Sequence, residues 1–190
     1  MHARSLILAF AWLLAACQGP QVARDYDPAR DFSRYRSWAW QEPGVRYRPD
    51  EPQLASDLTS DRLRQALTEQ LDQRGLRPAV AGQTPDLRVQ VWWILEQRQE
   101  QVVHAYGSPW GNGWGPGWNG YWGGPVLTET RNLTYQVNTL QVDLFDGKDG
   151  KLVWRGSAEQ PRHDRQQTPG ERTAAIGQTL AQVLAQYPPH

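Results

Sequence analysis

The chain has one cysteine, Cys17, and only two lysines, Lys148 and Lys151. A single cysteine cannot form a disulfide within the chain, so the fold must depend on core packing. The 20 basic and 20 acidic residues cancel in net charge, and the pI is about 6.9. A nucleic-acid-binding domain normally carries a basic face and a pI above roughly 9. The composition therefore argues against a nucleic-acid partner.

The chain also lacks a long hydrophobic run. A membrane-spanning helix needs about 20 consecutive apolar residues, and no run in this sequence is that long. The most apolar run, residues 6–16, follows the basic Arg4 and ends in small residues. This arrangement is typical of a secretory signal that is later removed. The run closes on Leu14-Ala15-Ala16-Cys17, which has the form of a lipobox. Cleavage before Cys17 would free its amino group and its thiol for acylation.

These features predict the domain organisation and the location of the protein. We expect residues 1–16 to be a lipoprotein signal peptide, 17–31 a lipidated tether and 32–190 a single domain. The expected partner is a membrane, reached through palmitate on Cys17. Gln18 follows the cysteine at the place where an aspartate would indicate retention at the inner membrane. The predicted location is therefore the cell envelope, on the periplasmic face of the outer membrane.

Two amphipathic helices are predicted. Residues 58–74 place their apolar side chains on one stripe, and Gly75 suits the left-handed position that follows a helix end. A second helix begins at Thr168-Pro169-Gly170-Glu171, which combines a capping box with proline in the first turn. Its apolar residues recur at helical spacing until Pro188-Pro189 ends it.

Alternating apolar residues predict the strands. The predicted strands are 35–40, 86–96, a weaker 97–106, 133–144 and 152–158. In 133–144 the apolar positions change parity near Asn138, which predicts a bulge or a break there. Residues 42–53 hold three prolines and are predicted to be a loop. The order of elements predicts an α+β fold: a mostly antiparallel sheet of four to five strands with both helices on one face.

Several short motifs occur in a fixed order along the chain. They are Asp25-Tyr26-Asp27-Pro28, Asp31-Phe32-Ser33-Arg34-Tyr35, Trp38-Ala39-Trp40, Arg74-Gly75, Pro85-Asp86-Leu87, Leu152-Val153-Trp154-Arg155-Gly156 and Tyr187-Pro188-Pro189. This ordered set resembles the bacterial lipoprotein family catalogued as domain of unknown function 4136. The resemblance implies a lipoprotein that faces the periplasm, and it supplies no catalytic residues. Tyr187 stands where that family usually has phenylalanine.

The segment 107–125 is rich in glycine and tryptophan. Its eight glycines and three prolines exclude a helix, because each interior glycine costs about 1 kcal/mol and each proline about 3 kcal/mol. We expect a long loop, in which Trp110, Trp114, Trp118 and Trp122 recur at every fourth position. Such a loop is either functional or merely low in complexity. The indole rings suit a glycan, a protein partner or a lipid headgroup interface.

Other candidate chemistry is weak. Asp143, Asp146 and Asp149 surround a predicted hairpin turn and suggest calcium, but their spacing does not fit a calcium loop and Asp-Gly is ordinary turn chemistry. His104 and His163 lie in no zinc-binding motif. We therefore expect no metal, no cofactor and no enzymatic activity.

The sequence thus predicts a non-catalytic, lipid-anchored envelope protein that presents a binding or envelope-maintenance domain. The alternative is a protein that binds glycan, either peptidoglycan or another polysaccharide, through the Trp-rich loop. A hydrolase is the third hypothesis, because residues that come together in the fold are not visible in the sequence.

Overall fold

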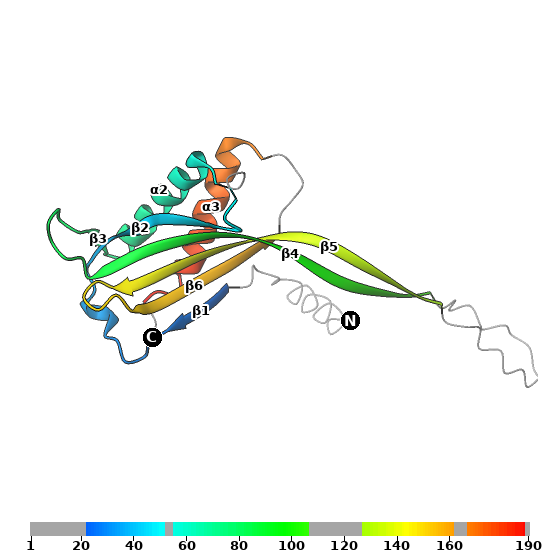
Figure 1. Ribbon diagram of the computed structural model, residues 1–190, viewed down its shortest axis with the longest axis horizontal. Helices are drawn as coiled ribbons and strands as arrows, with labels where there is room; N and C mark the ends of the chain where they lie inside the picture. Colours follow the sequence, from blue (N-terminus) through cyan, green and yellow to red (C-terminus); the bar gives the residue numbers. More distant parts are fainter. Residues whose placement is uncertain (1–21, 52–54, 107–126, 162–166, 189–190) are drawn as a thin grey trace, which may run out of the picture.

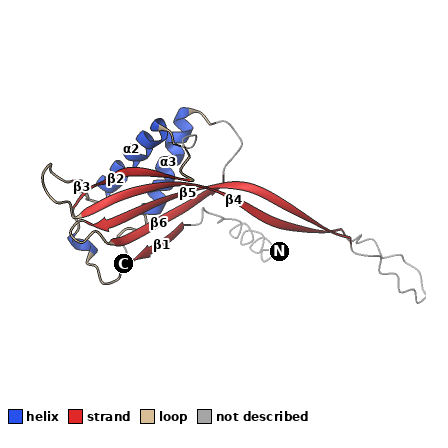
Figure 2. Ribbon diagram, in the orientation of Figure 1, coloured by secondary structure: helices blue, strands red, loops and turns tan. Residues whose placement is uncertain are grey.

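The computed structural model describes residues 22–51, 55–106, 127–161 and 167–188. It has two helices packed against one sheet, which confirms the α+β class (Figure 1). Colouring by secondary structure shows both helices on the same face of the sheet (Figure 2). No helix in these described ranges is long and apolar enough to cross a membrane.

The sheet has six strands in the order β1-β6-β5-β4-β2-β3. The strands are β1 (Val22–Tyr26), β2 (Ser37–Arg48), β3 (Arg77–Pro78), β4 (Leu87–Tyr106), β5 (Leu127–Asp146) and β6 (Leu152–Pro161). Strand β2 pairs in parallel with β3 and β4, and the other neighbours are antiparallel. The expected four to five strands were too few, and the sheet is mixed. The parallel pairing arises because the chain crosses over through a helix between β2 and β4.

Helix α2 (Asp57–Gln73) buries the predicted stripe against the sheet. Its buried residues are Leu63, Ala66, Leu67 and Leu71. After the helix Gly75 adopts a φ of 80°, a conformation that costs glycine little. This turn lets the Leu76 N–H reach the Leu71 carbonyl at 3.0 Å and brings the Leu76 side chain into the core. The predicted helix end is confirmed.

Helix α3 (Pro169–Leu184) begins as predicted. The Thr168 hydroxyl accepts from the Glu171 N–H, and the Glu171 carboxylate accepts from the Thr168 N–H at 2.7 Å. The end of α3 is tied to the end of α2, because the Arg74 side chain donates to the Leu184 carbonyl at 2.7 Å. The two helices and the face of the sheet beneath them form one hydrophobic core.

Two predictions near the start of the chain are wrong in part. The expected tether, 17–31, contains β1, the edge strand of the sheet, which pairs with β6. An edge strand needs no continuous apolar face, and the middle of β1 is exposed, so the sequence carried no alternating signal. The expected loop 42–53 contains the second half of β2, which resumes pairing at Val45 after an irregularity beyond Trp40. Pro43 lies within this strand and Pro49 directly follows it.

The predicted break near Asn138 is also wrong. Strands β4 and β5 pair without a register shift over their whole length, from Leu87 opposite Asp146 to Tyr106 opposite Leu127. The expected weak strand 97–106 is simply the outer part of β4.

The change of parity has a different cause, because the apolar side of β5 changes from one face of the sheet to the other. Leu140, Val142 and Leu144 face the helices and belong to the core. Residues of the other parity face the helix-free side of the sheet; among them Val137 is buried but outside that core. Leu133 and Tyr135 on the same side are 52% and 41% exposed. A single continuous strand thus places apolar side chains on the helix side of the sheet in one half and on the helix-free side in the other half.

Candidate functional site

The residues that the sequence singled out as sites lie mostly outside the described part of the structure. Those outside are Cys17, His163 and the four tryptophans Trp110, Trp114, Trp118 and Trp122. The expected loop 107–125 falls there too, as do the expected signal peptide, residues 1–16, and Gln18. The described residues nevertheless show what carries the Trp-rich segment, because it connects the end of β4 to the start of β5.

That connection is made at the end of a two-stranded ribbon. Strand β2 pairs with β4 only as far as Ile94, and β6 pairs with β5 only from Val137 onward. Beyond these points β4 and β5 pair only with each other among the described residues, and they project from the body (Figure 1). The ten residue steps from Glu96 to Tyr106 span about 34 Å at 3.4 Å per residue. An isolated two-stranded ribbon is marginally stable in water, so this projection gains less support from neighbouring strands than the rest of the sheet.

The first strand starts at the same end of the sheet. Val22 pairs with Ala158, which pairs with Leu140, which in turn pairs with Trp93, close to where the ribbon leaves the body. We call this the ribbon end of the sheet. The opposite end, which we call the turn end, contains the β5–β6 turn at residues 147–150. The chain therefore enters the domain at the ribbon end.

The turn end is held by a carboxylate network around Asp146, whose exposure is only 7%. Asp146 accepts from the Tyr35 hydroxyl at 2.9 Å and from the Lys148 N–H at 2.8 Å. Burial alone would raise the pKa of Asp146, but these hydrogen bonds outweigh it and the pKa lies below its usual value. Burial and the nearby carboxylate raise the pKa of Tyr35 to about 12.

The other two aspartates of the suggested calcium site have arginine partners. Asp149 accepts from the Arg30 guanidinium at 2.6 Å. Asp143, on β5 and 1% exposed, accepts two hydrogen bonds from Arg155 at 2.6 and 2.8 Å. No group of three metal-ligating side chains occurs among the described residues. The three carboxylates therefore serve the turn and the sheet.

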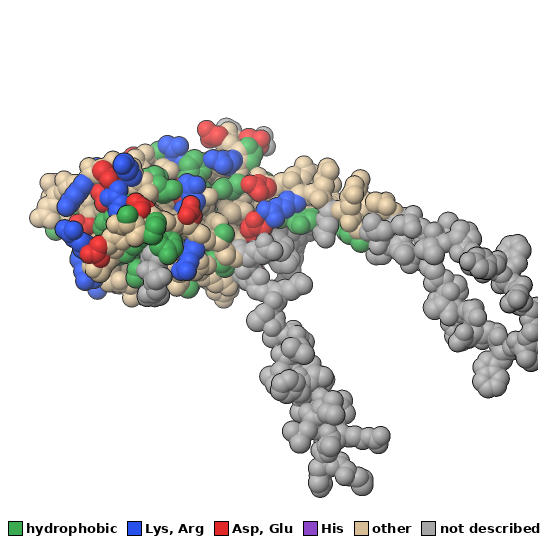
Figure 3. All heavy atoms as spheres, turned by 90° about the horizontal axis from the view of Figure 1, so that it is seen from below, with side chains coloured by type: hydrophobic (Ala, Val, Ile, Leu, Met, Phe, Trp, Pro, Cys, Tyr) green, Lys and Arg blue, Asp and Glu red, His purple; other side chains and the backbone are tan. Residues whose placement is uncertain are grey.

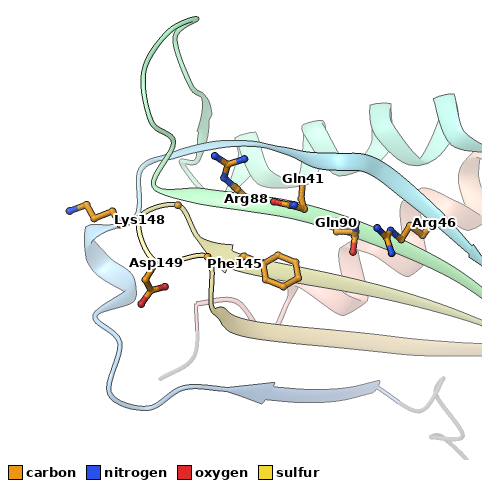
Figure 4. Close-up of a pocket in the computed structure, with 9 residues that line it drawn as sticks. Gln41, Arg46, Arg88, Gln90, Phe145, Lys148 and Asp149 are labelled. Carbon is orange, nitrogen blue, oxygen red and sulfur yellow. The ribbon is translucent and has the colours of Figure 1, made fainter.

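A cavity opens between the turn end and the helix-free face of the sheet. Its volume is about 520 Å³. The lining residues are Gln41 and Arg46 on β2, Arg88 and Gln90 on β4, Phe145 on β5, and Gly147, Lys148, Asp149 and Gly150 in the turn (Figure 4). Along β4, Arg88 and Gln90 alternate with the core residues Leu87, Val89 and Val91, so they point away from the helices.

The cavity has an excess of positive charge. Arg46, Arg88 and Lys148 line it, and no ion pair to any of the three occurs among the described residues. Its single carboxylate, Asp149, is already bound by Arg30. On the face of the body seen in Figure 3, acidic and basic side chains are interspersed. We call this positively charged cavity the basic cavity.

Two contacts fix the shape of the basic cavity. The Arg46 guanidinium carbon lies 5.2 Å from the centre of the Trp92 ring, a cation–π distance. At the turn, Gly147 lies so close to the preceding loop that an added Cβ would lie 1.7 Å from the Pro85 carbonyl oxygen. The Gly147 N–H donates to the Asp86 carbonyl at 2.8 Å. The rim is thus held by backbone contacts.

Part of this cavity is visible in the sequence. Arg88, Gln90 and Trp92 are the polar-face positions of a predicted strand, which identifies a side not wholly buried. Arg46 lies in what was expected to be a loop, so its place beside them could not be foreseen.

The family-like motifs near the two ends of the chain meet in an aromatic cluster. The Phe32 ring packs edge-on against Tyr26, Tyr35 and Tyr187, with centroids 5.8 to 6.1 Å apart. Tyr187 also packs against Trp154 at 5.6 Å. These motif residues join the start of the domain to its end, which is a structural role.

The sequence model of a family described as Domain of unknown function (DUF4136) matches residues 22–189. No curated protein matches the chain. Among solved structures, a PDZ domain protein from Parabacteroides distasonis has a TM-score of 0.51 at 13% identity; the alignment covers 100% of this chain and 41% of that one. This chain thus spans less than half of that relative's length.

Two further structures are similar over most of both chains. A DUF4136 family protein from Bacteroides thetaiotaomicron has a TM-score of 0.49 at 19% identity, with 90% of this chain and 97% of that chain covered. The PelC dodecamer from Paraburkholderia phytofirmans has a TM-score of 0.44 at 14% identity, with 88% and 96% covered.

Proposed function

Because this chain belongs to the DUF4136 family, whose defining domain fills residues 22–189, we propose that it is a non-catalytic lipid-anchored protein of the cell envelope. Cys17 carries the lipid, and the domain that follows is a binding or envelope-maintenance module on the periplasmic face of the outer membrane. Two or more acyl chains anchor a protein stably, since each buried methylene contributes about 0.8 kcal/mol.

The observation that carries this proposal is the spacing between the lipobox and the domain. Cys17 is the final residue of Leu14-Ala15-Ala16-Cys17, and β1 starts at Val22. The five residue steps between them reach at most about 18 Å at 3.6 Å per residue. An acylated Cys17 would therefore keep the ribbon end of the sheet close to the bilayer surface and leave the turn end facing away from it.

The described residues support a role in binding over one in catalysis. The two buried carboxylates among the described residues, Asp143 and Asp146, are committed to Arg155 and to the turn. A general acid or base needs a titrating group that can reach a substrate proton, and the bonds just described leave neither carboxylate available for that task. The projecting ribbon and the basic cavity are features suited to contact with other molecules.

The experiment is Cys17→Ser in the full-length chain, expressed with labelled palmitate. The wild-type protein should incorporate the label and fractionate with membranes, and the variant should do neither. Gln18→Ala is the matched control, because it alters the adjacent residue and leaves the thiol in place. Incorporation of label into Cys17→Ser would refute the proposal.

Glycan binding through the Trp-rich segment is the second candidate. It is favoured by the ribbon, which holds both ends of residues 107–126 about 34 Å from the body, well placed to contact an extended polymer. Replacing Trp110, Trp114, Trp118 and Trp122 together by serine should abolish retention on peptidoglycan and leave the melting temperature within a few degrees. Full retention by the variant would exclude this candidate, and loss of cooperative folding would show that the rings belong to the core.

A further inference from the structure

The basic cavity is built for a ligand that the anchoring proposal does not explain. Three cationic side chains, Arg46, Arg88 and Lys148, line it against one carboxylate that Arg30 already neutralises. None of the three has an ion-pair partner among the described residues, so each is available to pair with an anion. Both arginines are exposed, so their guanidinium groups remain accessible to a ligand.

We propose that the basic cavity binds the anionic group, a carboxylate or a phosphate, of a small polar ligand. Arg88 and Arg46 would supply charge-assisted hydrogen bonds, and the planar guanidinium group suits the two oxygens of either anion. The half-buried Phe145 ring gives the ligand an apolar surface beside them. The site is open to solvent and has a volume of about 520 Å³, which is room for a small polar group.

The cavity is formed before a ligand arrives. The Gln90 side chain donates to the Pro43 carbonyl at 3.1 Å, which fixes the irregular part of β2 against β4. Trp92 holds the Arg46 guanidinium over its ring, while the rim at Gly147 is pinned to the loop before β4. Binding therefore needs no rearrangement of the backbone, and of the two arginines only Arg88 lacks a contact, among the described residues, that already holds its side chain.

The position of the cavity favours a ligand in the periplasmic space. It lies at the turn end, whereas Val22, where the chain enters the domain, is at the ribbon end. The carboxylate of an acidic sugar and the phosphate of a lipid headgroup present the same anionic oxygens to arginine, so the experiment separates the two.

The test is isothermal titration calorimetry on the mature protein in an uncharged detergent. The probes are trigalacturonate for carboxylated sugars, glycerol 1-phosphate for headgroup phosphate, and maltotriose as the neutral control. One or both anions should bind and maltotriose should not; the tighter anion identifies the source. Arg88→Gln and Arg46→Gln should each weaken the anion about tenfold, the loss expected for one charge-assisted hydrogen bond.

Arg172→Gln is the matched control, because Arg172 is an exposed arginine at the start of α3, on the helix side of the sheet. It should leave anion binding unchanged. If either cavity variant fails to fold, the wild-type protein still tests the proposal. Its affinity for the anion must fall as ionic strength rises toward 1 M, where the screening length is about 3 Å. The proposal is overturned if neither anion binds, if maltotriose binds equally well, or if the affinity for the anion does not change with salt concentration. Acylation of Cys17 is measured separately, so this failure would not affect the anchoring proposal.

Discussion

Removing one oxygen atom from Tyr187 should make the protein more stable. The Tyr187 side chain is 6% exposed, and its hydroxyl has no hydrogen-bond partner among the described residues. The ring itself is well placed, packed edge-on against Phe32 and Trp154. Burial also raises the pKa of this hydroxyl, as expected for a group cut off from water. Tyr187→Phe keeps the ring contacts and removes the unpaired hydroxyl.

An unpaired buried hydroxyl costs about 1–3 kcal/mol in proteins. Tyr187→Phe should raise the free energy of unfolding by about that amount, and for a chain of this size each kcal/mol raises the melting temperature by about 2–4 °C. Thermal unfolding followed by circular dichroism measures the shift. A melting temperature that stays the same or falls would mean that the hydroxyl has a partner, and would refute the reasoning.

A tyrosine with a bonded hydroxyl gives the matched control. The Tyr47 hydroxyl lies 2.8 Å from the Ser60 hydroxyl and donates to the Ser56 carbonyl at 3.1 Å. Tyr47→Phe should therefore destabilise the protein by about 0.5–1.5 kcal/mol. The same chemical change thus has opposite signs at the two positions.

Two further changes test the turn and the core. Asp146→Asn should cost about 1–3 kcal/mol at pH 7, because charge-assisted hydrogen bonds are lost. Since the folded-state pKa of Asp146 is lowered, its contribution to stability is present above about pH 4 and is lost as the pH falls through that folded-state value. Urea unfolding should therefore show a smaller loss of stability for Asp146→Asn at acidic pH than at neutral pH. An equal loss at the two pH values would contradict this. Gly156→Ala should cost about 1–3 kcal/mol by overpacking, because an added Cβ would lie 2.3 Å from the Trp154 ring. Gly177→Ala should instead stabilise helix α3 by roughly 0.5–1 kcal/mol, because nothing lies within 4 Å of an added Cβ there. A destabilised Gly177→Ala variant, or a Gly156→Ala variant as stable as the wild type, would show that the packing around these glycines is wrongly assigned.

The helices could be predicted because their signals are local. The stripe that ends at Leu71, the glycine after it and the capping box at Thr168 each depend on residues within a turn or two. Alternation likewise placed most of β4, β5 and β6. These signals require no knowledge of what the segment packs against.

What the sequence could not reveal depends on distant pairing. Strand β1 forms because β6 offers a free edge to pair with. The residues of β1 are mostly exposed and polar, so they show no alternating apolar pattern. The apolar positions of β5 do change from odd to even residue numbers, as the sequence shows. Such a change has two possible causes, a bulge or a change in which face of the strand is buried. Only the neighbouring strands decide between them, and here they end at Ile94 and Val137 and leave a ribbon.

The candidate sites divide in the same way. The lipobox is a contiguous motif and needs no fold, so Cys17 could be chosen from sequence alone. The basic cavity joins Arg46 on β2 to Arg88 on β4 and Lys148 in the turn, residues that are brought together only by a parallel pairing across a helix. A search for local motifs could not assemble it.

The central claim is that Cys17 carries the lipid that anchors this domain in the envelope. Mass spectrometry of the N-terminal peptide of protein taken from the membrane fraction tests it most directly. The account predicts a peptide that begins at Cys17, bears acyl chains on its sulfur and on its amino group, and is absent in unmodified form. An N-terminal peptide that begins elsewhere, or one that begins at an unmodified Cys17, would contradict the account.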